Sequence, residues 1–188
     1  VEWEADDALG AAAQVADRDE RVEQVLIVTP DKDLGQCVSG RRVVQYDRRK
    51  REIIDEDAVR EKFGVGPESI PDYLGLVGDT ADGFPGLPGW GAKSASRVLD
   101  RYVHLEEIPP EASLWEVDGL RGAAKLSKTL QDQMELALLF RIIATVDRDV
   151  PVGTVDDWRW TGPTDDFPVR CEQLGVPALA TRAAALAP

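Results

Sequence analysis

The stretch GDTADGFPGLPGWGAKSA (residues 78–95) places two aspartates ahead of a turn rich in glycine and proline, and the turn leads into a helix. Glycine permits positive φ angles and close approach of another backbone, and the glycines concerned are Gly86, Gly89 and Gly91. The start of the helix offers free N–H groups to a phosphate, while Lys93 adds a charge and Ser94 a hydroxyl. The stretch therefore predicts a unit that binds a nucleic-acid backbone without reading bases. Taken alone, it is also compatible with a structural helix–turn–helix that carries a solvated lysine.

The two aspartates of this stretch form the last of three carboxylate groups along the chain. The members of the three groups are Glu4, Asp6 and Asp7, then Asp31 and Asp33, then Asp79 and Asp82. On a helix, residues three positions apart share a face, which applies to Glu4 with Asp7 and to the last pair. The middle pair follows the apolar run VLIV, and alternate residues of an extended chain point the same way.

Each carboxylate group alone has an ordinary explanation, because acids favour helix N-termini and surface helices often carry acid pairs. Two aspartates directly after a buried strand are less ordinary, since like charges repel there unless a cation compensates them. Oxygen ligands without histidine or cysteine favour Mg²⁺ or Mn²⁺ over zinc. The three groups together predict a site for two metal ions about 4 Å apart, which suits an in-line phosphoryl displacement.

The composition argues against several other mechanisms. The 188 residues include two cysteines and one histidine, His104, for which a packing or surface role is expected. Serine–histidine catalysis, a disulfide framework and a cysteine zinc site are therefore disfavoured. The net charge of −13 opposes binding to nucleic acid unless converging carboxylates hold divalent ions.

The sequence also gives an expectation about location. It contains no apolar run of roughly 18 residues, so no membrane span is predicted. No signal peptide is visible at the start, which predicts a cytoplasmic location.

The first part of the chain has the pattern of an α/β protein. The run VLIV (Val25–Val28) is rich in β-branched residues and predicts a strand buried on both faces, as in a parallel sheet. The segments RVVQYD and REII are short strand candidates on either side of the basic turn at residues 48–51.

The remainder of the chain reads as mainly helical. Apolar spacing and capping residues predict helices over residues 5–16, 55–63, 69–77, 92–102, 130–143 and 167–174. Glycine and proline cluster at residues 64–71. We therefore expect a boundary there, between an α/β part (residues 1–70) and a helical part (residues 71–188).

The motifs EADD, TPDKDLGQ and GDTADGFPGLPGWGAKSA, in this order, resemble the 5′-nuclease superfamily. The likeness is greatest to the bacterial 5′→3′ exonucleases and flap endonucleases, including the 5′-nuclease domain of DNA polymerase I, and it runs from Glu4 to about Val152. Two departures are Trp90, where the family commonly has a smaller aliphatic residue, and DGFPG in place of DNLPG.

The resemblance implies a PIN-like parallel-sheet core followed by a helix–three-turn–helix at about residues 78–102. It implies that the first acidic group serves one metal ion and that the other two groups serve a second. It further implies that the glycine-rich hairpin holds duplex DNA, often with K⁺ bound by backbone carbonyls. The implied substrates are 5′ flaps and nicked or gapped duplexes, processed in replication and repair by a monomer.

The resembling family carries a substantial N-terminal region before the point that matches Glu4. It holds a first strand, further metal-binding aspartates and a basic helical arch. We therefore expect these 188 residues to be the C-terminal part of a longer protein.

The sequence thus predicts a metal-dependent, structure-specific 5′ nuclease. One alternative is a DNA-junction binding module with an incomplete metal site, which would bind flap DNA and not cleave it. A second alternative is a magnesium phosphatase for small molecules, which the glycine-rich hairpin disfavours.

Overall fold

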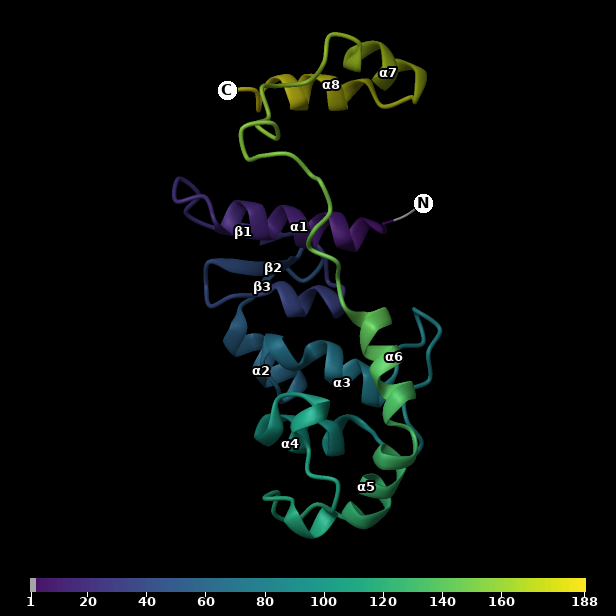
Figure 1. The fold of residues 1–188 in the computed structure, drawn as a ribbon. Helices are drawn as coiled ribbons and strands as arrows, with labels where there is room; N and C mark the ends of the chain where they lie inside the picture. Colours follow the sequence, from purple (N-terminus) through teal and green to yellow (C-terminus); the bar gives the residue numbers. More distant parts are fainter. Residues whose placement is uncertain (1–2) are drawn as a thin grey trace. The chain divides into compact units, whose positions relative to one another are not determined.

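The computed structural model describes residues 3–188 (Figure 1). Contacts between residues divide the chain into two compact units, one up to Val152 and the other Gly153–Pro188. Among the described residues, the first unit holds a three-stranded sheet and six α-helices, and the second holds two short helices.

The sheet lies in the N-terminal part of the first unit, next to helix α1 (Ala5–Asp17) (Figure 1). Its strands are β1 (Val25–Ile27), β2 (Val43–Asp47) and β3 (Glu52–Ile54), in the order β1-β2-β3. β1 and β2 are parallel, whereas β2 and β3 form an antiparallel hairpin. All three predicted strands are confirmed, and so is the α/β class.

The prediction that the first strand is buried on both faces is wrong. Ile27 is 3% exposed, but Leu26 is 49% and Val28 is 55% exposed. Ile27 packs into a small cluster with Ala13 of α1 and Val43 of β2. Among the described residues, only the face of β1 that carries Ile27 is covered by other side chains. The apolar run is therefore buried on one face and exposed on the other.

Helix α2 (Glu56–Phe63) begins and ends as its capping residues predict. The Asp55 carboxylate accepts a hydrogen bond from the N–H of Ala58 at 3.0 Å, and Gly64 ends the helix with φ of 70°. An oxygen at the N-cap and a glycine in the left-handed conformation are the usual local signals for these two ends.

Helices α3 (Ile70–Val77) and α4 (Ala92–Tyr102) are confirmed where the sequence predicted them. The expected single helix over residues 130–143 is wrong, because two helices occupy this region: α5 (Ala123–Asp132) and α6 (Met134–Ala144). The chain breaks at Gln133, whose φ of −130° is not helical. The described part of this unit also contains four 3₁₀ turns: η1 (Asp33–Cys37), η2 (Pro67–Ser69), η3 (Leu105–Glu107) and η4 (Ala112–Leu114).

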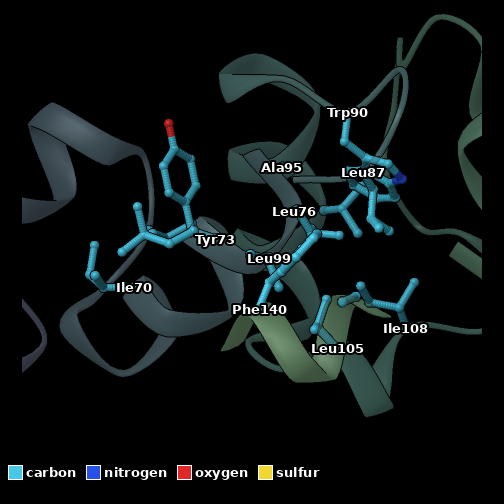
Figure 2. Packing of buried hydrophobic residues seen from close by; sticks show 14 of the residues in the cluster. Ile70, Tyr73, Leu76, Leu87, Trp90, Ala95, Leu99, Leu105, Ile108 and Phe140 are labelled. Atoms are coloured by element: carbon cyan, nitrogen blue, oxygen red, sulfur yellow. The ribbon is translucent and has the colours of Figure 1, made fainter. Parts of the chain in front are cut away.

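The main hydrophobic core lies among the helices of the first unit (Figure 2). Figure 2 shows side chains from α3, from the glycine-rich turn, from α4 and from α6, and those it labels include Leu76, Leu87, Trp90, Leu99 and Phe140. Trp90 is 7% exposed, and its ring centroid lies 6.1 Å from that of Trp115. Trp90, one of the two departures from the family pattern, therefore packs in the core.

A buried carboxylate ties α3 to its neighbours. Asp72 is 2% exposed, and its Oδ1 accepts hydrogen bonds from Arg141 Nη1 at 3.0 Å and from the N–H of Leu105 at 3.2 Å. Its Oδ2 lies 3.0 Å from Nδ1 of His104. The single histidine therefore has a structural contact, as expected. Arg141 also pairs with Glu106 at 2.6 Å, so one guanidinium joins α6 to two acids.

The second unit contains α7 (Phe167–Gln173) and α8 (Pro177–Ala184). The sequence predicted α7 but not α8, which has a proline in its first turn. Cys171, at 2% exposed, is the one buried residue of α7. Within the described part of the chain, no helix has the length and apolar character needed to cross a membrane.

Candidate metal centre and phosphate-binding cleft

Three carboxylates converge at the end of the sheet and helix α3. Asp33, Asp79 and Asp82 each offer an oxygen, and these oxygens lie within 4.8 Å of one another. Asp33 is the first residue of η1, which follows β1, whereas the other two lie on the turn after α3. Ligands of α/β proteins usually bind at the carboxyl end of the strands.

The environment of Asp33 fits a cation. Its side chain is buried, and Oδ1 has no hydrogen-bond partner among the described residues. Burial, followed by the nearby carboxylates of Asp82, Asp31 and Asp79, raises the pKa of Asp33 to about 8. A buried, unpaired carboxylate oxygen among like charges is what a divalent ion with oxygen ligands would stabilise.

The turn that carries Asp79 and Asp82 is held by backbone contacts. The N–H of Asp79 donates to the carbonyl of Phe84 at 2.9 Å, and the N–H of Phe84 donates back at 3.0 Å. Gly78 and Gly86 have φ angles of 87° and 69°, and a Cβ on Gly86 would lie 2.4 Å from the nitrogen of Gly78. Side chains at these two positions would push the turn apart.

This geometry corrects the expectation that Asp79 and Asp82 lie one helical turn apart. Helix α3 ends at Val77, so both aspartates lie on a bridged turn. Asp79 is 2% exposed and Asp82 is exposed. A spacing of three residues brings side chains together on such a turn as well as on a helix.

The expectation for Asp31 and Asp33 also needs correction. They do not lie on extended chain, because the backbone turns into η1 directly after Asp31. Asp31 is exposed, and its Oδ1 accepts the N–H of Asp33 at 3.3 Å. Asp31 thus shapes the turn that buries Asp33, while its charge still reaches Asp33 and Asp6.

The first acidic group lies at the N-terminus of α1. Glu4 is the N-cap, and its N–H donates to Asp7 Oδ2 at 2.9 Å. The other oxygen of Asp7 accepts the N–H of Asp147 at 2.8 Å. Burial and then the charges of Asp31 and Glu4 raise the pKa of Asp6.

A cavity of about 680 Å³ connects the first group with the converging carboxylates. Its acidic lining residues are Glu4, Asp6, Asp7, Asp33, Asp82 and Asp147. The structure therefore places five of the seven predicted acids around one cavity. The other two acids do not line the cavity. Asp79 belongs to the three-carboxylate cluster with Asp33 and Asp82, and the charge of Asp31 acts on Asp6.

Sequence reasoning missed a further wall of this cavity, residues 143–147, which comprise the last two residues of α6 and the three that follow. Gln36 attaches this wall to η1. Its Nε2 donates to the carbonyls of Asp33 and Ala144, both at 2.8 Å, and its Oε1 accepts the N–H of Val146 at 3.0 Å. Ala144 and Val146 lie more than 100 positions from Gln36 along the chain, so no local pattern could identify these two contacts.

Lys32 is a second residue that the sequence reading left without a role. Its Nζ lies 2.5 Å from Asp79 Oδ2. Burial alone would raise the pKa of Asp79, but hydrogen bonds from Lys32 and from the N–H of Ala81 outweigh burial and lower it. The cluster therefore contains a lysine ammonium among its carboxylates.

A cationic cleft of about 870 Å³ lies at the start of α4. Gly89, Gly91, Lys93 and Ser94 of the predicted hairpin line it, together with Arg97 and the turn at residues 119–121. Among the described residues that line it, none is acidic. This cleft has the charge and the free helix N-terminus that a phosphate needs.

Two residues of the predicted hairpin have other contacts. The Ser94 hydroxyl accepts the N–H of Gly91 at 3.0 Å, which caps the helix. Gly86 packs against the acidic turn instead of lining the cleft. Sequence reasoning missed Arg97 and Arg121; Arg97 Nη1 donates to the carbonyl of Gly119 at 3.1 Å and holds the second wall.

A small mixed sheet with acids beyond its strand ends, followed by helices that carry a cationic cleft, defines an α/β protein that combines a candidate metal centre with a candidate phosphate-binding surface. The chain belongs to the 5′-3′ exonuclease family. The family's N-terminal resolvase-like domain matches residues 1–64, and its C-terminal SAM fold matches residues 65–166.

Curated relatives agree with this family. DNA polymerase I of Bacillus caldotenax is 37% identical over 166 residues, which cover 85% of this chain and 18% of that protein. The 5′-3′ exonuclease of Buchnera aphidicola (subsp. Acyrthosiphon pisum) is 30% identical over 149 residues, covering 79% of this chain and 51% of that protein. The chain thus spans about half of an exonuclease relative and less than a fifth of the polymerase.

Solved structures show the same fold. The T5 5′-exonuclease has a TM-score of 0.61 at 19% identity, over 78% of this chain and 56% of that one. The T5 D15 flap endonuclease, in a pseudo-enzyme–product complex with DNA and metal ions, has a TM-score of 0.62 at 20% identity. This match covers 78% of this chain and 50% of that chain.

Proposed function

We propose that this chain carries the metal-binding and DNA-binding parts of a 5′ nuclease that hydrolyses DNA phosphodiesters near junctions of single strand and duplex. One observation carries the proposal: three carboxylate oxygens lie within 4.8 Å of one another, and an Asp33 oxygen among them is buried without a partner. Membership of the 5′-3′ exonuclease family supports the same activity.

The acidic residues would hold divalent ions, for which Mg²⁺ and Mn²⁺ are the best candidates because the ligands are all oxygens. Asp33, Asp79 and Asp82 would hold one ion, and Glu4, Asp6 and Asp7 would form the second side of the cavity. Bound divalent ions supply an activated water and stabilise charge on the phosphate. The Asp31 carboxylate accepts the backbone N–H of Asp33 and so holds Asp33 in place.

The cationic cleft would bind the duplex backbone. Lys93, Arg97 and Arg121 supply positive charge from two walls, and α4 supplies backbone N–H groups. Contacts of this kind position a duplex without reading its sequence. The natural substrates would be 5′ flaps and nicked or gapped duplexes in replication and repair. K⁺ at the hairpin, a monomeric state, a cytoplasmic location and a preceding N-terminal region of the same protein stay predictions.

Cleavage of an end-labelled 5′-flap DNA in Mn²⁺, compared with gel-shift binding in Ca²⁺, tests the proposal. Asp33→Asn should abolish cleavage and leave binding in place, whereas Asp132→Asn changes an exposed acid of α5 and should cleave normally. Binding with no cleavage by the unaltered chain would favour a DNA-junction binding module. Neither binding nor cleavage would refute the proposal.

A further inference from the structure

Lys32, the lysine in TPDKDLGQ, contacts a carboxylate oxygen that a metal ion at the cluster would also bind. Lys32 Nζ contacts Asp79 Oδ2 at 2.5 Å, and the Asp79 side chain is only 2% exposed. Asp79 is one of the three aspartates whose oxygens converge. Lys32 itself is 34% exposed, so its ammonium reaches the cluster from the solvent side and can withdraw to it.

The two oxygens of Asp79 have different contacts. Oδ1 accepts the N–H of Ala81 at 2.9 Å, which belongs to the turn that holds the cluster in shape. Oδ2 is the oxygen that Lys32 contacts. Because the turn uses the first oxygen, the second is the one available to a cation, and Lys32 already holds it.

A lysine is suited to this role because its ammonium is a compact charge on a flexible chain. Its backbone lies between Asp31 and Asp33, so the ammonium is tethered beside the site and competes as an intramolecular ligand. A divalent ion that uses Asp79 Oδ2 must displace it. The displacement leaves the turn intact, since the Ala81 hydrogen bond is made by the other oxygen.

We propose that Lys32 is an internal counter-cation that competes with the divalent ion for Asp79 Oδ2 and thereby lowers the affinity of the centre for metal. This inference rests on the proposed function, because it takes the three aspartates to be metal ligands. Lys32 holds Asp79 in the metal-free protein and gives it up when the metal ion binds. It is thus a positioning residue that sets the metal concentration at which the centre fills.

Direct measurement of Mn²⁺ binding, by the electron paramagnetic resonance signal of free Mn²⁺, tests the proposal without an activity assay. Lys32→Met removes the competing charge and should tighten Mn²⁺ binding roughly tenfold, the size expected for losing one charge-assisted hydrogen bond. Lys62→Met is the matched control. This substitution removes the same charge from helix α2, where the Lys62 ammonium lies 4.7 Å from the Phe63 ring centroid.

Lys62→Met should change the Mn²⁺ affinity by less than roughly threefold, since only a screened long-range interaction is lost. Lys32→Arg keeps the positive charge and should stay closer to the unaltered protein than Lys32→Met does. Circular dichroism in EDTA confirms that each variant is folded. Lys32→Arg also provides a test should Lys32→Met fail to fold.

The outcomes separate the two proposals. Mn²⁺ binding that Asp33→Asn abolishes, but that Lys32→Met leaves unchanged or weakens, would overturn the role of Lys32 and leave the metal centre standing. Equal tightening by Lys32→Met and Lys32→Arg would also overturn it, because the lost charge would then not be the cause. The absence of Mn²⁺ binding in every protein would overturn both proposals.

Discussion

Replacing Asp33 by asparagine should stabilise the metal-free protein. Burial and neighbouring carboxylates raise the pKa of Asp33 to about 8, whereas an unfolded chain has the ordinary value of 3.8. Above pH 3.8 the unfolded chain has released this proton while the folded chain retains it, so stability falls as pH rises towards 8. Asparagine has nearly the same shape and does not titrate, so the variant avoids this loss.

The magnitude follows from the two pKa values. When only the folded state holds the proton, the free energy of unfolding falls by about 1.4 kcal/mol for each pH unit. The loss of stability due to Asp33 is therefore at most about 4 kcal/mol at pH 7. Relaxation and water entry reduce the effect, and we expect Asp33→Asn to gain about 1–3 kcal/mol at pH 8. The difference should be small near pH 4, where the unfolded chain is only partly ionised, and should vanish below pH 3.8, where both states hold the proton.

Urea unfolding in EDTA at pH 4, 6 and 8, followed by circular dichroism, measures this difference. Asp100→Asn, an exposed acid on α4, is the control and should show little change at any pH. Saturating Mn²⁺ should reverse the order, because only the unaltered protein gains binding energy from the metal ion. A variant that is less stable than the unaltered protein at pH 8, or a difference independent of pH, would refute the reasoning.

Three further changes have defined outcomes. Gln36→Leu should destabilise the protein by about 2–4 kcal/mol in urea unfolding, because several buried hydrogen bonds are lost and their backbone partners are left unpaired. Lys93→Ala and Arg121→Ala should each weaken binding to all duplex sequences alike and lower the salt slope in fluorescence anisotropy by about one unit; a loss confined to certain sequences would contradict backbone binding. Arg141→Met should cost about 3 kcal/mol in thermal or urea unfolding, because the buried Asp72 loses its cationic partner; a neutral effect would show that the other contacts of Asp72 suffice.

Arg141 also gives a pH dependence. Its hydrogen bonds outweigh burial and hold the pKa of Glu106 below its usual value of 4.5. The stability from this pair is therefore present above pH 4.5 and is lost as pH falls through the lowered pKa in the folded protein. Acid unfolding of Arg141→Met should lack this component, and a curve parallel to that of the unaltered protein would exclude it.

The elements that sequence reasoning placed correctly are those with local signals. Asp55 and Gly64 mark the two ends of α2, and the apolar spacing of α4 predicted its bounds. Gln133 gives no such signal, since glutamine is a good helix former. The break there depends on how α5 and α6 pack, which the sequence does not show.

The candidate site divides in the same way. Residue type and order pointed to seven acids, because few structural roles require so many carboxylates in three groups, and five of the seven line one cavity in the structure. Their geometry was not predictable: a spacing of three fits the bridged turn at Asp79 as well as a helix. Gln36 and Asp147 reach the site only through contacts between distant parts of the chain.

In the proposed function, the stretch at residues 78–95 accounts for DNA binding by a chain of net charge −13. It carries both the acidic turn and the start of α4, and the side chains between them, Phe84, Leu87 and Trp90, are 4%, 3% and 7% exposed. The N–H of Leu87 also donates to the carbonyl of Leu76 at 2.9 Å. Because close-packed cores resist deformation, the separation between acidic cavity and cationic cleft is fixed. In the proposed function, a duplex held at the cleft would place a phosphodiester at a constant distance from the acids, and selectivity for structure would follow without base contacts.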